Sequence, residues 1–291
     1  GDKDGFASVI DSAGTTLIAS TFIGTSGYDQ SFIVGTDKTN HIYLFGQTEA
    51  TGNTFNVNTA IGVSGGNQFL MKYDPMLTTI VWSNAFGSAS GSPDIAPTAL
   101  LVDLCDKIYC TGWGGVLNPF GQGTNGLITT PDAFQSSTDN NDFYLYVMDN
   151  QAQSLIYASF LGGPNSLDHV DGGTSRFDRK GVIYQSICAG CGGQSDFPGI
   201  TANSFSPTNN SFNCNNLLVK FDFESPITVS AFASITDPIG CAPYTAEFSN
   251  TSVNADLFSW RIGDTEISTA SNFTYTFTES GTYEVVLIAT S

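Results

Sequence analysis

The sequence is poor in positive charge and in charge of any kind. Only 9 of the 291 residues are Lys or Arg and 2 are His, against 27 Asp and Glu, which gives a net charge of −18. Because phosphate groups are bound by clustered cations, this composition excludes nucleic acid as a natural partner and argues against attraction to an anionic membrane. It suits an extracellular protein, or one that meets divalent cations.

Long apolar segments and helical patterns are also absent. No apolar run approaches the roughly 18 residues of a membrane-spanning helix, and no signal peptide is recognisable. The first residue is Gly1 in place of Met, so we expect any export signal to lie upstream. No stretch combines helical periodicity with caps at both ends, which predicts an all-β protein without direct membrane insertion.

What the sequence does contain is a phrase that returns four times. Each copy is a short apolar and aromatic segment that closes with an aspartate, at Asp11, Asp74, Asp149 and Asp222. Three further segments rich in β-branched and aromatic residues follow the first three copies, bounded by Gly, Asn, Asp or Ser, which is the pattern of β-strands. Four strands per repeat predict the blades of a β-propeller.

The number of repeats predicts a partial β-propeller over residues 1–225. Three units and one further strand, 217–223, give about three four-stranded blades, whereas closed propellers have roughly four to eight. An open stack would leave an apolar edge, so we interpret this region as the C-terminal part of a longer propeller. Strand 217–223 could complete a blade that begins upstream.

The character of the sequence changes after Ser225-Pro226, a plausible linker. Residues 226–291 contain five to seven short segments of alternating pattern around a central Trp260, with Phe273, Tyr275 and Phe277 on one face. This predicts a second domain, a small Ig-like β-sandwich.

The cysteines fall into two groups and a single residue. Cys105 and Cys110 could form a disulfide within one strand–turn region, and Cys188, Cys191 and Cys214 form the second cluster, with Cys241 alone in the second domain. Six cysteines allow 15 full pairings, so the sequence does not fix the connectivity. Disulfide bonding in an exported protein is the favoured interpretation.

Two other interpretations of the second cysteine cluster remain open. Cys188, Cys191 and Cys214 with His169 offer four candidate zinc ligands. A redox role for Cys188 and Cys191 is disfavoured, because no helix follows to stabilise a thiolate.

Three further polar or aromatic motifs are candidates for a site. His169, Asp171 and Ser175 could form a catalytic set, but no Gly-x-Ser-x-Gly elbow surrounds the serine, so we favour an inter-strand loop. The segment 139–142 resembles half of a calcium loop without its glycine and terminal glutamate, so a turn is favoured and calcium is the alternative. Trp113 precedes two glycines and is expected to pack between blades rather than to stack on a sugar.

These segments support three family resemblances. The run Leu-Ile-Tyr-Ala-Ser-Phe-Leu-Gly-Gly at 155–163, together with 129–135, resembles the SBBP-type bacterial β-propeller repeat. Residues 169–178 and 188–193 resemble a block in large surface proteins of gliding bacteria, which are exported by the type IX secretion system. Residues 241–243, 260–264 and 281–285 resemble a polycystic kidney disease (PKD) domain, although Thr265 stands where the family usually has glycine.

The resemblances imply a non-enzymatic, exported protein of the bacterial cell surface with an adhesion or structural role. They imply no cofactor and no catalytic residues, and they imply as partners other surface proteins or extracellular glycans, besides further domains of the same protein. The alternative is an accessory region of a secreted polysaccharide-degrading enzyme or protease. A propeller enzyme acting on glycans is disfavoured by the scarcity of histidine.

Overall fold

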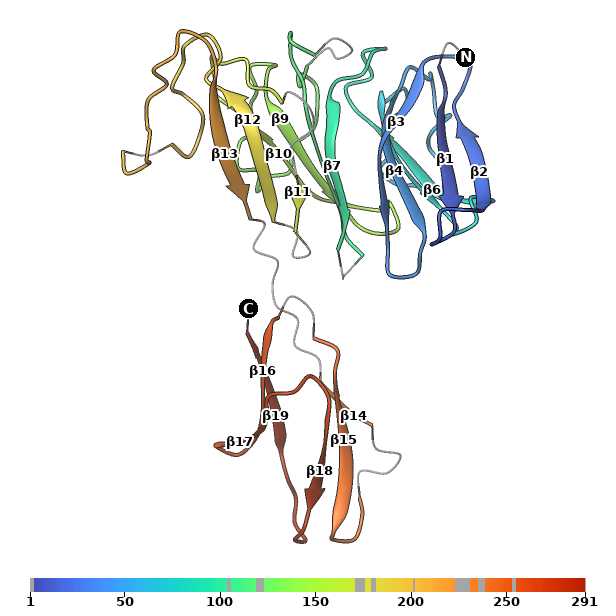
Figure 1. Ribbon diagram of the computed structural model, residues 1–291, viewed down its shortest axis with the longest axis vertical. Helices are drawn as coiled ribbons and strands as arrows, with labels where there is room; N and C mark the ends of the chain where they lie inside the picture. Colours follow the sequence, from blue (N-terminus) through green and yellow to red (C-terminus); the bar gives the residue numbers. More distant parts are fainter. Residues whose placement is uncertain are drawn as a thin grey trace. The chain divides into compact units, whose positions relative to one another are not determined.

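The computed structural model consists of two compact units, Gly1–Asp222 and Phe223–Ser291 (Figure 1). It describes residues 3–103, 106–118, 123–170, 176–178, 182–200, 202–222, 231–234, 239–252 and 255–290. All elements in these ranges are strands, as the sequence predicts, so the described chain contains no helix that could cross a membrane. The units divide close to the expected boundary after residue 225.

The first unit contains four antiparallel sheets that follow one another along the chain. The first sheet is β1 (Gly5–Ile10) and β2 (Leu17–Ile23). The second is β3 (Asp29–Thr36), β4 (Ile42–Thr48), β5 (Gln68–Tyr73) and β6 (Ile80–Phe86). The third is β7 (Ala96–Val102), β8 (Ile108–Trp113), β9 (Phe143–Met148) and β10 (Leu155–Leu161). The fourth is β11 (Arg176–Phe177), β12 (Ile183–Ala189) and β13 (Asn215–Phe221).

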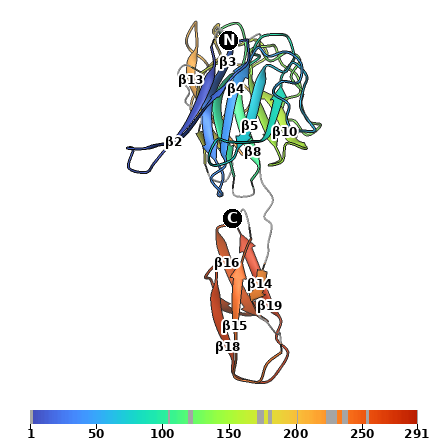
Figure 2. The same cartoon turned by 90° about the vertical axis from the view of Figure 1, so that its right-hand side faces the viewer.

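Within each sheet the strand order is the chain order, so every connection joins neighbouring strands. The first strands of successive sheets adjoin, with β7 in contact with both β3 and β11, and β1 in contact with β3. The sheets therefore stand in a row in the order of the sequence, and Figures 1 and 2 show this row from two sides.

The grouping of strands into sheets differs from the predicted repeat unit. Three of the four recurring phrases, β5, β9 and β13, are the third strand of a sheet, and only the first phrase, β1, begins one. β5 and β9 pair with the strand before as well as the strand after: Leu70 of β5 lies opposite Phe45 and Asn84. The described sheets therefore have two, four, four and three strands, rather than three blades of four and one extra strand. They do not close into a ring within the described residues, so the propeller is not confirmed.

The two ends of the sheets differ in their connections. One end carries the short turns, and an aspartate side chain closes each of them. Asp74 Oδ1 accepts hydrogen bonds from the backbone N–H groups of Thr78 and Thr79 at 2.6 and 2.8 Å. In the turn between first and second strands, Asp37 Oδ1 accepts the N–H of His41 at 3.0 Å. A short carboxylate side chain thus satisfies backbone donors that the tight turn leaves unpaired.

The same short turns recur in the other sheets. Asp11 and Asp149 occupy the place of Asp74, and Asp103 and Asp178 occupy the place of Asp37. Because antiparallel strands alternate in direction, the remaining connections all leave from the opposite end. Those between the second and third strands are long, at 49–67, 114–142 and 190–214. In Figure 1 they lie at the upper end of the sheets, which we call the long-loop end.

Aromatic side chains fill the space between neighbouring sheets. Phe86 of β6 stacks on Tyr146 of β9 with ring centroids 4.4 Å apart, which joins the second and third sheets. Trp113 lies in the cluster between the third and fourth sheets, with Phe143 and Ile187. The predicted packing of Trp113 between sheets is therefore confirmed.

The second unit is a sandwich of two three-stranded sheets. One contains β14 (Ala231–Ser234), β15 (Tyr244–Asn250) and β18 (Phe273–Phe277), and the other contains β17 (Thr265–Ser268), β16 (Leu257–Ile262) and β19 (Val285–Thr290). Trp260 is fully buried between them against Phe248 and Phe273, and its Nε1 donates to the carbonyl oxygen of Ala270 at 3.0 Å. The predicted Ig-like sandwich is confirmed.

Two phenylalanines at one repeat position test the packing of the first unit. Phe160 and Phe22 each stand two residues before a glycine, but Phe160 is 3% exposed and Phe22 is 82% exposed. We expect Phe160→Ala to lower the free energy of unfolding by about 3–5 kcal/mol. Phe22→Ala should change it by less than about 0.5 kcal/mol. Urea unfolding followed by tryptophan fluorescence measures both, and equal losses would contradict the exposure of β2.

Candidate functional site

The best-defined candidate site is the disulfide-closed loop 190–214 at the long-loop end of the fourth sheet. The bond joins Cys191, just after β12, to Cys214, just before β13, across a sequence separation of 23. Closing a loop of this length removes chain entropy from the unfolded state and stabilises the fold by about 3 kcal/mol. The disulfide predicted among the clustered cysteines is therefore present, between these two residues.

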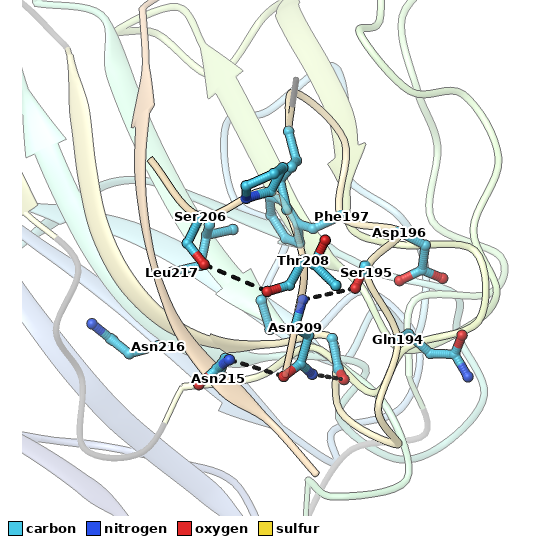
Figure 3. Close-up of a pocket in the computed structure, with 14 residues that line it drawn as sticks. Gln194, Ser195, Asp196, Phe197, Ser206, Thr208, Asn209, Asn215, Asn216 and Leu217 are labelled. Carbon is cyan, nitrogen blue, oxygen red and sulfur yellow. Dashed lines mark hydrogen bonds between the residues drawn. The ribbon is translucent and has the colours of Figure 1, made fainter. Parts of the chain in front are cut away.

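A small pocket of about 70 Å³ opens within this loop (Figure 3). Its walls are organised by Asn209, whose Nδ2 donates to the carbonyl oxygens of Gly190 and Asn213 at 2.9 and 2.8 Å. The Oδ1 of Asn209 accepts the N–H of Ser211 and the Nδ2 of Asn215, both at 2.9 Å. These four bonds occupy the whole amide, so Asn209 shapes the pocket and is not a ligand-binding group.

The outer part of the loop carries two almost completely exposed phenylalanine side chains, Phe205 and Phe212. Phe205 is 107% exposed and Phe212 is 95% exposed, relative to an isolated residue. Large apolar side chains that protrude fully from a polar loop are the kind of group that anchors a protein–protein or protein–glycan contact. No sequence pattern distinguishes these two residues, because isolated phenylalanines also occur at core positions throughout the chain.

Asp168 lies buried at the base of the loop. Its Oδ2 accepts hydrogen bonds from the N–H of Gly163 and the Oγ of Ser166, both at 2.8 Å, and its Oδ1 accepts the N–H of Gly190 at 2.9 Å. Burial raises the pKa of Asp168 above its ordinary value, although these donors oppose the shift. The carboxyl group of Asp168 therefore joins the loop after β10 to the loop after β12, which is a structural role.

The second and third sheets have a buried aspartate of the same kind, Asp29 and Asp94. Asp29 accepts the N–H and hydroxyl of Thr25, and Asp94 accepts those of Ser88. Burial likewise raises the pKa of Asp94. This series was missed in the sequence, because the number of residues between the preceding glycine and the aspartate differs from repeat to repeat.

His169 is held next to Asp168, facing the core between the third and fourth sheets. Its backbone exchanges hydrogen bonds with Cys188 at 3.1 and 3.0 Å, and its ring lies 5.6 Å from the ring of Trp113. Nδ1 lies 2.9 Å from the carbonyl oxygen of Leu167. Asp171 and Ser175, the other members of the considered catalytic set, lie outside the described residues.

Three of the four candidate zinc ligands come together in space. The ligand atoms of His169, Cys191 and Cys214 all lie within 4.8 Å of one another, and no other such group of three occurs in the part of the chain that the structure describes. Cys188 does not belong to this group. In the state shown, the two sulfur atoms are bonded to each other, so the candidate ligands form a disulfide beside an imidazole.

The predicted disulfide between Cys105 and Cys110 is wrong, because Cys110 is a free and buried thiol. Strand β8 directs Cys110 into the core between the second and third sheets, where its thiol donates to the carbonyl oxygen of Tyr146 at 3.3 Å. Burial raises the pKa of this thiol well above its ordinary value. Cys105 lies outside the described residues. Cys241 is an exposed thiol in the second unit.

The side chains of the candidate calcium segment 139–142 turn to different backbone partners. Asp139 Oδ1 accepts the N–H of Asn141 at 2.8 Å, and Asn141 Oδ1 accepts the N–H of Val116 at 3.0 Å. Asn140 Oδ1 accepts the N–H of Asn125 at 2.9 Å. These bonds tie neighbouring loops together, as the favoured turn interpretation requires, and calcium binding stays a prediction.

Asp142, the last residue of that segment, is fully buried against the backbone of Gly162. Its Oδ1 has no hydrogen-bond partner among the described residues. Burial, with the nearby charges of Asp139 and Asp168, raises the pKa of Asp142 to about 6. The repeat places an uncharged Asn67 at the same position, directly before β5.

Comparison with known proteins identifies the second unit. Residues 224–291 match the family model of the PKD domain, so this part of the chain is a PKD domain with the Ig-like fold described above. No curated protein matches the chain. The PKD domain and the Cys191–Cys214 disulfide together suggest an extracellular protein.

The buried Asp142 predicts a pH dependence of stability. Because its pKa is higher in the folded state than its ordinary value near 3.8, the folded protein holds the proton more tightly than the unfolded chain. The contribution of Asp142 to the free energy of unfolding is therefore fully present below about pH 4. It falls by up to about 3 kcal/mol as the pH rises through about 6. Asp142→Asn should flatten this fall and raise stability at pH 7, in urea unfolding curves from pH 4 to 7.

The matched control is the reverse change at the sister position. Asn67→Asp places a new carboxyl group in a fully buried site and should steepen the fall in stability over the same range. Asp94 and Asp168 have raised pKa values in both proteins, so the difference between parent and Asp142→Asn isolates Asp142. Parallel pH profiles for the parent and Asp142→Asn would contradict the assignment.

Proposed function

We propose that the chain is part of an exported, non-enzymatic surface protein with an adhesion or structural role. The first unit is its binding or scaffold platform, and the PKD domain is a spacer or contact module. The observation that carries the proposal is the PKD domain at 224–291, an extracellular type of module. The disulfide supports it, because such bonds persist in oxidising compartments.

In this proposal the first unit belongs to a larger β-propeller of the SBBP type. The strand order within each sheet and the contact between the first strands of successive sheets support it, since propeller blades are arranged in this way. The likeness of 169–178 and 188–193 to surface proteins of gliding bacteria supports export by the type IX route.

Ligands of the platform are other surface proteins or extracellular glycans, bound at the long-loop end. Binding residues concentrate on loops that a rigid scaffold positions, and this end carries the longest connections. Phe205 and Phe212 offer apolar anchors there. A role in binding rather than catalysis is supported by Asp168 and Asn209, whose polar atoms are used to hold the loops.

The platform role predicts that adhesion depends on the exposed side chains of Phe205 and Phe212. Beads coated with the full chain carrying Phe205→Ser and Phe212→Ser should adhere at least about tenfold less to surfaces coated with extracellular glycan or surface protein of the source cell. The control carries Phe6→Ser and Phe22→Ser, two exposed rings of the first sheet. Equal loss in both variants, or no adhesion of the parent to either surface, contradicts the platform role.

Export predicts where the protein is found. An antibody against the chain should label intact source cells or detect the protein in the medium, and external protease should remove the cell-bound signal. A signal that appears only after the cells are made permeable would contradict export, whatever the adhesion assay shows.

A further inference from the structure

His169, Cys191 and Cys214 are arranged as ligands of a single ion. Their ligand atoms lie within 4.8 Å of one another, and Cys191 Sγ lies 3.7 Å from His169 Nδ1. In a tetrahedral zinc site, with Zn–S and Zn–N bonds of about 2.3 and 2.0 Å, neighbouring ligand atoms lie about 3.5–3.8 Å apart. The sulfur–nitrogen distance already falls in this range. Metal binding through Nδ1 requires the two sulfur atoms to separate and Nδ1 to give up its hydrogen bond to the carbonyl oxygen of Leu167.

The backbone around these residues is fixed by bonds other than the disulfide. His169 is paired with Cys188 of β12 through two backbone hydrogen bonds, and Asp168 Oδ1 accepts the N–H of Gly190, which directly precedes Cys191. On the other side, Cys214 directly precedes β13, which pairs with β12 along its length. The three candidate ligands therefore keep their positions when the sulfur–sulfur bond is broken.

The environment of the group favours metal binding by thiolates. His169 and Cys191 are buried, and the ring of Trp113 lies beside the ring of His169. Soft thiolate and imidazole ligands select zinc and similar thiophilic ions over calcium or magnesium. Three protein ligands leave one position for water, the pattern of an open zinc site.

We propose that this disulfide and a zinc site are two states of the same residues. A dithiol reductant supplies two electrons, the Cys191–Cys214 bond breaks to give two thiols, and the dithiol becomes a disulfide. Zinc(II) then forms two bonds to sulfur and one to an imidazole nitrogen of His169, and the two thiol protons leave to solvent. Loop 192–213 stays closed at its base in both states. The inference does not depend on the proposed surface role.

The test compares zinc binding by the full chain in its two redox states. The chain is reduced on an immobilised dithiol, separated from it without oxygen, and titrated with Zn²⁺ against a chromophoric chelator. We expect one tightly bound ion per reduced chain and none in the oxidised chain. With Co²⁺ as the probe, a thiolate-to-cobalt charge-transfer band should appear only after reduction.

Matched variants identify the ligands. His169→Gln should weaken zinc binding by the reduced chain at least about tenfold, and Cys214→Ser should remove the charge-transfer band. The control is Cys188→Ser, which removes a thiol on the neighbouring strand outside the ligand group and should leave the affinity unchanged. His169→Gln keeps the disulfide, so the urea midpoint of its oxidised form shows whether the variant is folded.

A second readout follows the loop itself. Chymotrypsin should cut at the exposed Phe205 and Phe212 faster after reduction, and Zn²⁺ should restore the slower rate until a chelator is added. The proposal is overturned by any of three results: no stoichiometric binding by the reduced chain, including the case in which reduction unfolds it; an affinity unchanged by His169→Gln; or equal weakening by Cys188→Ser.

Discussion

The first unit depends on one constraint: the second and third strands of its complete sheets are buried on both faces. Every residue of β4, β5, β8 and β9 is buried, so neither face of these central strands meets water. Such a sheet is stable only between two neighbours, and contacts such as Phe86 on Tyr146 provide them. The row of sheets and the separation of short turns from long loops follow from this stacking, which places the candidate site at the long-loop end.

The strands could be predicted from the sequence, but their grouping could not. A repeat of four strands looks the same wherever the first is chosen, and only pairing, such as Leu70 with Phe45, shows where a sheet begins. The phrase aspartates were visible because they recur at the end of a strand. Asp37 and Asp29 belong to equally regular series, yet each is a single aspartate in a turn or loop of changing length, and its role appears only from its hydrogen-bond donors.

The candidate site was predictable as a set of residue types but not as an arrangement. The cluster of Cys188, Cys191 and Cys214 is evident in the sequence, whereas the pairing of Cys191 with Cys214 depends on β12 and β13 lying side by side. Cys110 was misassigned because a nearby cysteine suggested a bridge, while strand alternation turns its side chain into the core. Burial decided between thiol and disulfide there, and burial is a property of the packed sheets.

The need for burial on both faces also applies to the sheets at the two ends of the row. Leu70, Leu145 and Leu218 occupy one position of the repeat, yet the first two are fully buried and Leu218 is 78% exposed. Leu218 shares a face with Tyr184 of the inner strand β12, which is 46% exposed, so no neighbouring sheet covers this face among the described residues. In addition, β5 and β9 each have a fourth strand beside them, whereas β13 is the last described strand of its sheet. An apolar strand with an open edge is a template for pairing. The sequence of β13 is therefore that of the third strand of a four-stranded sheet, and a strand from another segment or another molecule would complete its edge as β6 and β10 complete the edges of its counterparts.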